Sequence, residues 1–309
     1  MSASIVVGFD PNGTDEGPVQ FALAAARFTG APLVIAAVFA GDLALDRLAE
    51  GEFREELSAD ARDALDGLRT RLEGEEGVRA EVRLVEASSA ARGLAVALED
   101  EGAGLAVVGA TSRGAVGRRL MGSTAERVIH GAPCPVAVVP HGFTGGELDS
   151  IGVAYTSSPE GEQALRSGIV LARAAGAGLR VITVLREQIG TIGGHVTGRR
   201  AAQQLPEEIA AQHRLAVSDA LKSELGKEGG DEINAEIELV YGDPADALAD
   251  FTDVIDLLVM GSRAYGPHRS VVLGGVSRRL TATSQCPVIV LPRGAEHPLR
   301  ELLADQRPA

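Results

Sequence analysis

Hydrophobic positions along the chain change their spacing repeatedly, from short alternating or continuous runs to longer stretches with a three-to-four-residue period. The short runs predict strands, and the longer stretches predict amphipathic helices between them. In the first half the predicted strands are 4–8, 33–39, 80–86, 105–109 and 136–139, and the predicted helices are 19–29, 43–72, 90–101 and 123–130. Strands that alternate with helices indicate a parallel, doubly wound sheet of the α/β class.

The second half of the chain repeats this order. The segment LAVVGATSRGAVGRRLMGSTAERVIHGAPCPVAVVPHG begins at Leu105 and aligns without a gap with LLVMGSRAYGPHRSVVLGGVSRRLTATSQCPVIVLPRG, which begins at Leu257. The strands predicted by this repeat are 150–154, 179–185, 233–241, 257–261 and 288–291. We interpret the chain as two copies of one domain, at 1–141 and 150–294. A Gly-rich polar linker at 142–149 joins them, and a charged tail at 295–309 is expected to be loosely ordered.

Composition and charge narrow the classes of partner. Of the 309 residues, 45% are hydrophobic but only 3% are aromatic, so the cores must be built from Ala, Val, Leu and Ile. The net charge of −14 argues against a nucleic-acid or anionic-membrane partner, although a local loop can still be positive. Cys134 and Cys286 stand in apolar runs and are interpreted as buried structural thiols. Without a signal peptide or a long apolar run, the expected location is the cytoplasm.

The Gly-rich segment at 109–128, GATSRGAVGRRLMGSTAERV, carries the candidate chemistry. It follows a buried strand and leads into a helix, which places Gly122, Ser123 and Thr124 at a helix N-terminus that favours an anion. The sequence from Ser123 to Glu126 also fits a capping box, which would explain the serine without any ligand. Charge-assisted contacts to phosphate could come from Arg113, Arg118 and Arg119. Both interpretations stay open on the residues alone.

These residues resemble the universal stress protein family over nearly the whole chain, twice. The family motif G-x2-G-x9-G-[S/T] reads Gly109-x2-Ser112-x9-Gly122-Ser123 here, with Asp10 after the first strand and CPV before the last. The resemblance implies two tandem Rossmann-like domains of the adenine nucleotide alpha hydrolase type, each a five-stranded parallel sheet with helices on both faces. One departure is Ser112, which costs roughly 1 kcal/mol if that position needs a positive φ. Gly114 could then supply the tight bend instead.

The resemblance further implies ATP, with Mg²⁺ or Mn²⁺, in the first copy. Gly8 would allow close approach, Asp10 would lie at the ribose and metal, and the backbone of Val38 would meet the adenine. The implied ribose and phosphate contacts are Gly109, Ser112, Arg113, Arg119, Gly122, Ser123 and Thr124. Asp10 also has a simpler interpretation, because Asp in D-P-N-G after a strand favours a turn.

The second copy carries a weaker version of the same site. Thr156 replaces Asp10, Ala264 replaces the second motif glycine, Gly275 replaces Ser123, and Tyr155 is expected to line the loop region. The positions that would form this second site are Thr156, Val184, Gly261, Ala264, Gly274, Gly275 and Val276.

Two hypotheses about function follow from the resemblance. The first is an ATP-binding sensor or regulator of the stress response, in which nucleotide orders the glycine loop and shifts the affinity for an unknown protein partner. The second is an interaction scaffold with vestigial sites. Because no nucleophile and base stand together in a recognised motif, we expect no enzyme beyond a slow ATPase. The family also implies that strands 136–139 and 288–291 pair within one chain as a pseudo-dimer, with a homodimer left open.

Overall fold

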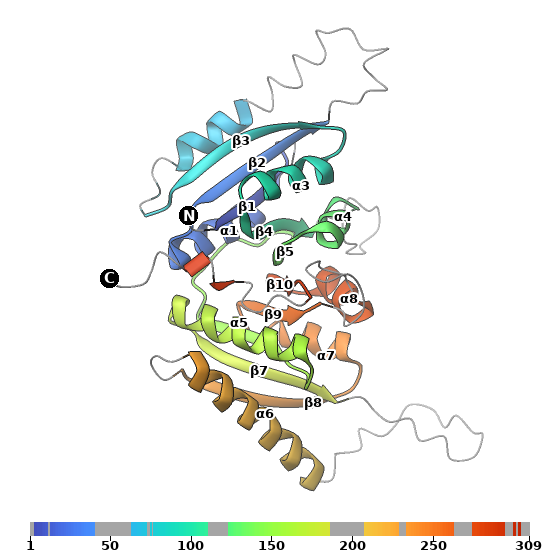
Figure 1. The fold of residues 1–309 in the computed structure, drawn as a ribbon. Helices are drawn as coiled ribbons and strands as arrows, with labels where there is room; N and C mark the ends of the chain where they lie inside the picture. The colour runs from blue at the N-terminus through green and yellow to red at the C-terminus, as the bar shows by residue number, and fades with distance from the viewer. Residues whose placement is uncertain are drawn as a thin grey trace, which may run out of the picture.

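Figure 1 shows the fold in the computed structural model, which describes residues 3–11, 13–40, 63–72, 75, 77–110, 123–185, 207–228, 233–262, 274–293, 299–300 and 302–303. The first copy contains, in chain order, β1 (Ser4–Phe9), α1 (Gly17–Thr29), β2 (Leu33–Ala40), helix 63–72, β3 (Ala80–Ala87), α3 (Ala90–Asp100), β4 (Ala103–Ala110), α4 (Ser123–Gly131) and β5 (Val136–Pro140). The second copy contains β6 (Ser150–Ala154), α5 (Pro159–Ala175), β7 (Gly178–Leu185), α6 (Glu207–Glu228), β8 (Ala235–Tyr241), α7 (Pro244–Phe251), β9 (Leu257–Gly261), α8 (Gly275–Thr283) and β10 (Val288–Leu291). The predicted strands are all present, and of the helix predicted for 43–72 the part before residue 63 lies outside the described residues.

The strands form one sheet that runs through both copies. Its ten strands have the order β3-β2-β1-β4-β5-β10-β9-β6-β7-β8. Neighbouring strands within each copy are parallel, and β5 and β10 pair antiparallel at the centre. The expected pairing of the two last strands within one chain is therefore confirmed.

The central pairing follows the internal repeat. Val138 lies opposite Val288, Ala137 opposite Ile289, and Val136 opposite Val290. Since Ala137 and Ile289 are equivalent positions in the two copies, a pseudo-twofold axis passes between them. The two copies therefore meet as the subunits of a symmetric dimer would meet.

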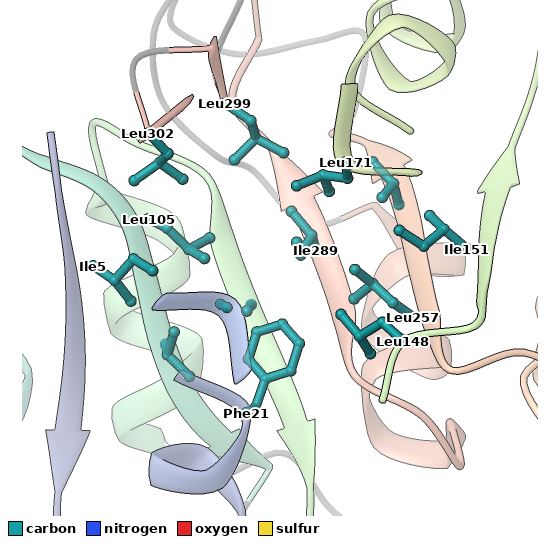
Figure 2. Packing of buried hydrophobic residues seen from close by; sticks show 14 of the residues in the cluster. Ile5, Phe21, Leu105, Leu148, Ile151, Leu171, Leu257, Ile289, Leu299 and Leu302 are labelled. Carbon is teal, nitrogen blue, oxygen red and sulfur yellow. The ribbon is translucent and has the colours of Figure 1, made fainter. Parts of the chain in front are cut away.

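Helices cover both faces of the sheet, as the alternation of strands and helices predicts. Helices α1, α5, α6 and helix 63–72 pack on one hydrophobic cluster, and α3, α4, α7 and α8 pack on the other. The first cluster continues across the β5–β10 pairing and includes Ile5 and Leu105 of the first copy as well as Ile289 and Leu257 of the second (Figure 2). The core is almost entirely aliphatic, in agreement with the low aromatic content. The two copies therefore share one core on this face.

The two cysteines lie in the second of these clusters, each 5% exposed. Both thiols are free. Burial raises the pKa of Cys134 and that of Cys286 to about 12. The interpretation of both residues as buried structural thiols is confirmed.

The linker between the copies is packed against the first copy rather than extended through solvent. The ring of Phe143 meets the buried ring of Phe21 edge to face at 6.3 Å between centroids. Leu148 is buried in the shared core. Asp15, just before α1, accepts a hydrogen bond from the amide of Gly142 at 3.3 Å. Residues 142–149 form neither a helix nor a strand, and two apolar side chains anchor them to the core.

Two leucines of the C-terminal tail are buried, which corrects the expectation of loose order at these two positions. Leu299 and Leu302 are each 1% exposed and belong to the shared core. They lie beside the central strands of both copies (Figure 2). A Cβ atom added to Gly104 would lie 2.9 Å from Leu302 Cδ2, so the tail fills space left by this glycine at the start of β4. Charge and proline dominate the local sequence, but the burial of two leucines outweighs them.

Candidate functional site

The candidate site of the first copy lies where the carboxyl ends of β1, β2 and β4 meet. β1 stands between β2 and β4, so the direction of strand addition reverses at this point of the sheet. The register pairs Val7 with Val107, and Gly8 with Ala36 of β2. Residues that follow these pairs, Asp10 and Gly109 among them, therefore share one edge. In open α/β sheets ligands bind at such a switch point.

Asp10 begins a turn at the exit of β1. Its carbonyl oxygen accepts a hydrogen bond from the Gly13 amide at 2.9 Å. A Cβ atom on Gly13 would lie 3.2 Å from the Cβ of Asp10, so the turn is tight. The turn interpretation of D-P-N-G is thus confirmed for the backbone. The side chain of Asp10 is exposed beside the strand ends, and its role as a ligand stays a prediction.

Glycines at this edge make room for α3. A Cβ atom on Gly8 would lie 3.2 Å from Leu94 Cδ2, and one on Gly93 would lie 2.4 Å from Val38 Cγ1. The sequence interpretation assigned the small size of Gly8 to the approach of a ligand. The structure shows a second reason, because helix α3 lies directly over the ends of β1 and β2 here. The side chain of Val38 packs against this helix. Only the backbone of Val38 could therefore contact an adenine ring.

Helix α4 follows the Gly-rich segment and begins at Ser123. The capping-box interpretation depends on the side chain of Ser123, which is not among the described residues, so it stays a prediction. Thr124 is exposed in the first turn. Glu126 lies 3.8 Å from the Arg278 guanidinium of α8, which joins the first turns of the two equivalent helices across the copies. The predicted residues Ser112, Arg113, Arg119 and Gly122, and the side chain of Ser123, lie outside the described part of the chain.

In the second copy the start of α5 packs closely against the ends of the equivalent strands, β6 and β9. Thr156 Oγ1 lies 3.0 Å from Ser158 Oγ. Ser158 in turn caps α5 by accepting a hydrogen bond from the Gly161 amide at 3.1 Å. A Cβ atom on Gly261 would lie only 2.7 Å from the carbonyl oxygen of Glu160. The position equivalent to Asp10 is therefore part of a helix cap.

Other predicted residues of the second copy are placed as follows. Tyr155 is 6% exposed and packs in the hydrophobic core, so the expectation that it lines the loop region is wrong. Val184, near the end of β7, packs against the cluster on the α7 and α8 face. Gly274 precedes α8 without a side-chain cap, and Gly275 and Val276 open that helix. Ala264 lies outside the described residues.

An ion-pair network near the end of β8 was missed by the sequence interpretation. Asp243 caps α7 and also accepts a hydrogen bond from Arg279 of α8 at 3.0 Å. Arg279 donates a second hydrogen bond to Asp246 at 2.6 Å. Hydrogen bonds from the amides of Asp246 and Ala245, together with the Arg279 charge, lower the pKa of Asp243. The Asp-Pro pair at a helix start was a usable signal for the cap, but nothing local identified the arginine.

Two features are absent from the described residues. Among them, no group of three or more His, Cys, Asp or Glu side chains converges on a point that could hold a metal ion. The helices within the described ranges are also too short or too polar to span a bilayer.

Comparison with known proteins gives concordant results. A family model described as the universal stress protein family matches residues 1–140 and 147–292. Universal stress protein Rv2319c of Mycobacterium tuberculosis is 29% identical over 301 residues, which cover 94% of this chain and 99% of that protein. The crystal structure of a universal stress protein from Archaeoglobus fulgidus has a TM-score of 0.66 at 20% identity, with 95% of this chain and 97% of the other covered. A putative universal stress protein from Pseudomonas aeruginosa has a TM-score of 0.63 at 18% identity, covering 98% and 96%. The chain therefore belongs to the universal stress protein family.

Proposed function

We propose that the first copy binds ATP together with Mg²⁺ or Mn²⁺, and that the protein acts as a nucleotide-dependent regulator in the stress response. The observation that carries this proposal is the meeting of Gly8, Asp10 and Gly109 at the switch point of the sheet, near the start of α4. A Gly-rich segment that leads into a helix N-terminus offers amide groups to phosphate. Ordering of this segment by nucleotide would change which surface the protein presents to a partner.

Asp10 is the proposed protein ligand of the metal ion. Mg²⁺ is commonly held by one or two carboxylates plus substrate phosphates and water, so a single exposed carboxylate at the strand end suits it. ATP would supply the phosphate oxygens. The same carboxylate could accept a hydrogen bond from a ribose hydroxyl.

The second copy is proposed to bind nucleotide more weakly than the first. Thr156 provides no charge for a metal ion, and it is held by the cap of α5. The backbone of Glu160 lies close to Gly261 at the edge where Gly109 stands in the first copy. We therefore expect one tight site in each chain.

Calorimetric titration of the full chain with Mg-ATP tests the proposal. We expect saturation near one equivalent, and Asp10→Asn should weaken binding about tenfold, which is the loss of roughly 1.4 kcal/mol. Thr156→Ala is the matched control at the equivalent position and should leave the affinity unchanged. Absence of heat at millimolar ATP, with no effect of Gly122→Glu, would refute nucleotide binding and favour the scaffold hypothesis.

We also propose that turnover of ATP is slow or absent, because the recognised motifs include no base beside an attacking water. Phosphate release should stay near the rate of the blank. A rate well above the blank that disappears in Asp10→Ala would overturn this part of the proposal.

A further inference from the structure

A cavity of about 130 Å³, partly open to solvent, lies between α1 and helix 63–72, beside the end of β1. Its apolar wall includes Phe9, Val19 and Leu68. The cavity is on the α1 face of the sheet, whereas Gly8 is oriented toward Leu94 of α3 on the other face. It is therefore separate from the proposed nucleotide site, although Phe9 directly precedes Asp10.

The charged groups around the rim of this cavity are already paired. Arg71 contacts Glu16 at 2.5 Å, and Arg27 contacts Glu75. A charged ligand would have to separate one of these pairs before it gained a partner. The rim therefore favours a neutral ligand.

In the second copy, larger side chains stand at the positions equivalent to those that line this cavity. By the internal repeat, Phe9, Val19 and Gln20 correspond to Tyr155, Leu165 and Arg166. Arg166 donates a hydrogen bond at 2.9 Å to Glu224, which is 3% exposed between α5 and α6. The carboxylate of Glu224 also acts on the phenol of Tyr155, whose pKa is raised mainly by burial and further by Glu162 and Glu224. The equivalent positions of the second copy thus carry larger side chains, and a buried ion pair joins α5 to α6 there.

We propose that the cavity of the first copy is a binding site for a neutral, single-ring apolar molecule. The volume is close to that of an engineered apolar cavity of about 150 Å³ that takes up benzene. Binding would move the apolar surface of the ligand from water to the aliphatic and aromatic wall, which favours binding. This inference goes beyond the proposed nucleotide function and does not depend on it.

Titration of the full chain with fluorobenzene, followed by ¹⁹F NMR in the absence of nucleotide, tests the inference. We expect saturable binding with a Kd on the order of 1 mM, a modest affinity for a ligand of this size. Val19→Phe, which fills the cavity from α1, should weaken binding at least tenfold. Val96→Phe makes the same change at a position on α3 that is 41% exposed and should leave binding unchanged.

A thermal melt of each variant distinguishes a filled cavity from an unfolded protein. If Val19→Phe does not fold, Leu68→Phe fills the same space from the opposite wall and carries the test. The inference is overturned if the wild-type protein shows no saturation at 10-fold the expected Kd, or if the filling variants bind fluorobenzene as tightly as Val96→Phe does.

Discussion

Replacement of Leu302 by Ala should destabilise the whole protein, because this side chain belongs to the core that the two copies share. Leu302 is 1% exposed and lies against the start of β4 at Gly104. The substitution removes three carbon groups at about 0.8 kcal/mol each, or roughly 2.4 kcal/mol, before the cavity left behind is counted. Measured Leu→Ala changes in cores lie at about 3–5 kcal/mol. We therefore expect a loss of about 3 kcal/mol in the free energy of unfolding.

Urea unfolding followed by far-UV circular dichroism measures this loss as a lower midpoint at an unchanged slope. Leu215→Ala makes the same chemical change on α6 at a side chain that is 64% exposed, and should stay within about 0.5 kcal/mol of wild type. The loss from Leu302→Ala cannot exceed the free energy with which this end of the chain packs on the core. A chain that ends at Pro298 should therefore lose at least as much as Leu302→Ala. A loss below 0.5 kcal/mol in both would refute the packing of the tail.

Three further substitutions probe the packing of α5 and α6. Gly168→Ala would place a Cβ atom 2.2 Å from Val153 Cγ2. We therefore expect the free energy of unfolding, measured by thermal denaturation, to fall by about 2 kcal/mol. Gly226→Ala on α6, where the added atom meets nothing within 4 Å, should instead stabilise the protein by about 0.5–1 kcal/mol. If both substitutions changed the stability equally, the close packing of Gly168 against Val153 would be contradicted. Burial alone would raise the pKa of Glu224, but hydrogen bonds from Arg166 and Lys227 lower it overall. The stability that Glu224 contributes is therefore present above its unfolded pKa of about 4.3 and is lost as pH falls through the lower folded value. Glu224→Gln should cost about 2 kcal/mol at pH 7 and progressively less below pH 4, and a pH-independent cost in urea unfolding would contradict this.

The alternation of apolar runs was enough to predict the strands and their parallel order. Each run is short, buried and bounded by polar turns, so local pattern and tertiary environment agree. The edge of the sheet on which Asp10 and Gly109 stand could be predicted for the same reason, since parallel strands end together. The internal repeat also pointed to the equivalent positions in the second copy.

Contacts between distant segments could not be predicted in this way. Leu299 and Leu302 form too short a pattern to show a period, and their burial depends on space beside a strand almost 200 positions earlier in the chain. Tyr155 was expected near the loop because it directly precedes Thr156. Its place on the inward face of the sheet buries it instead. The role of Gly8 beneath Leu94 was hidden for the same reason, because only the packed α3 creates the need for a small residue there.

The pairing of Ala137 with Ile289 has a consequence for how this sheet could have been built. In a homodimer, the residue on a twofold axis must face its own copy, so a small residue faces a small one and a large residue faces a large one. Here the two partners are encoded at separate positions of one chain, and a small side chain faces a large one. Covalent connection also keeps the two halves at a high effective concentration, so their association does not weaken on dilution. The central strands are therefore free to diverge into an unequal, complementary pair, just as Asp10 and Thr156 have diverged at the strand ends.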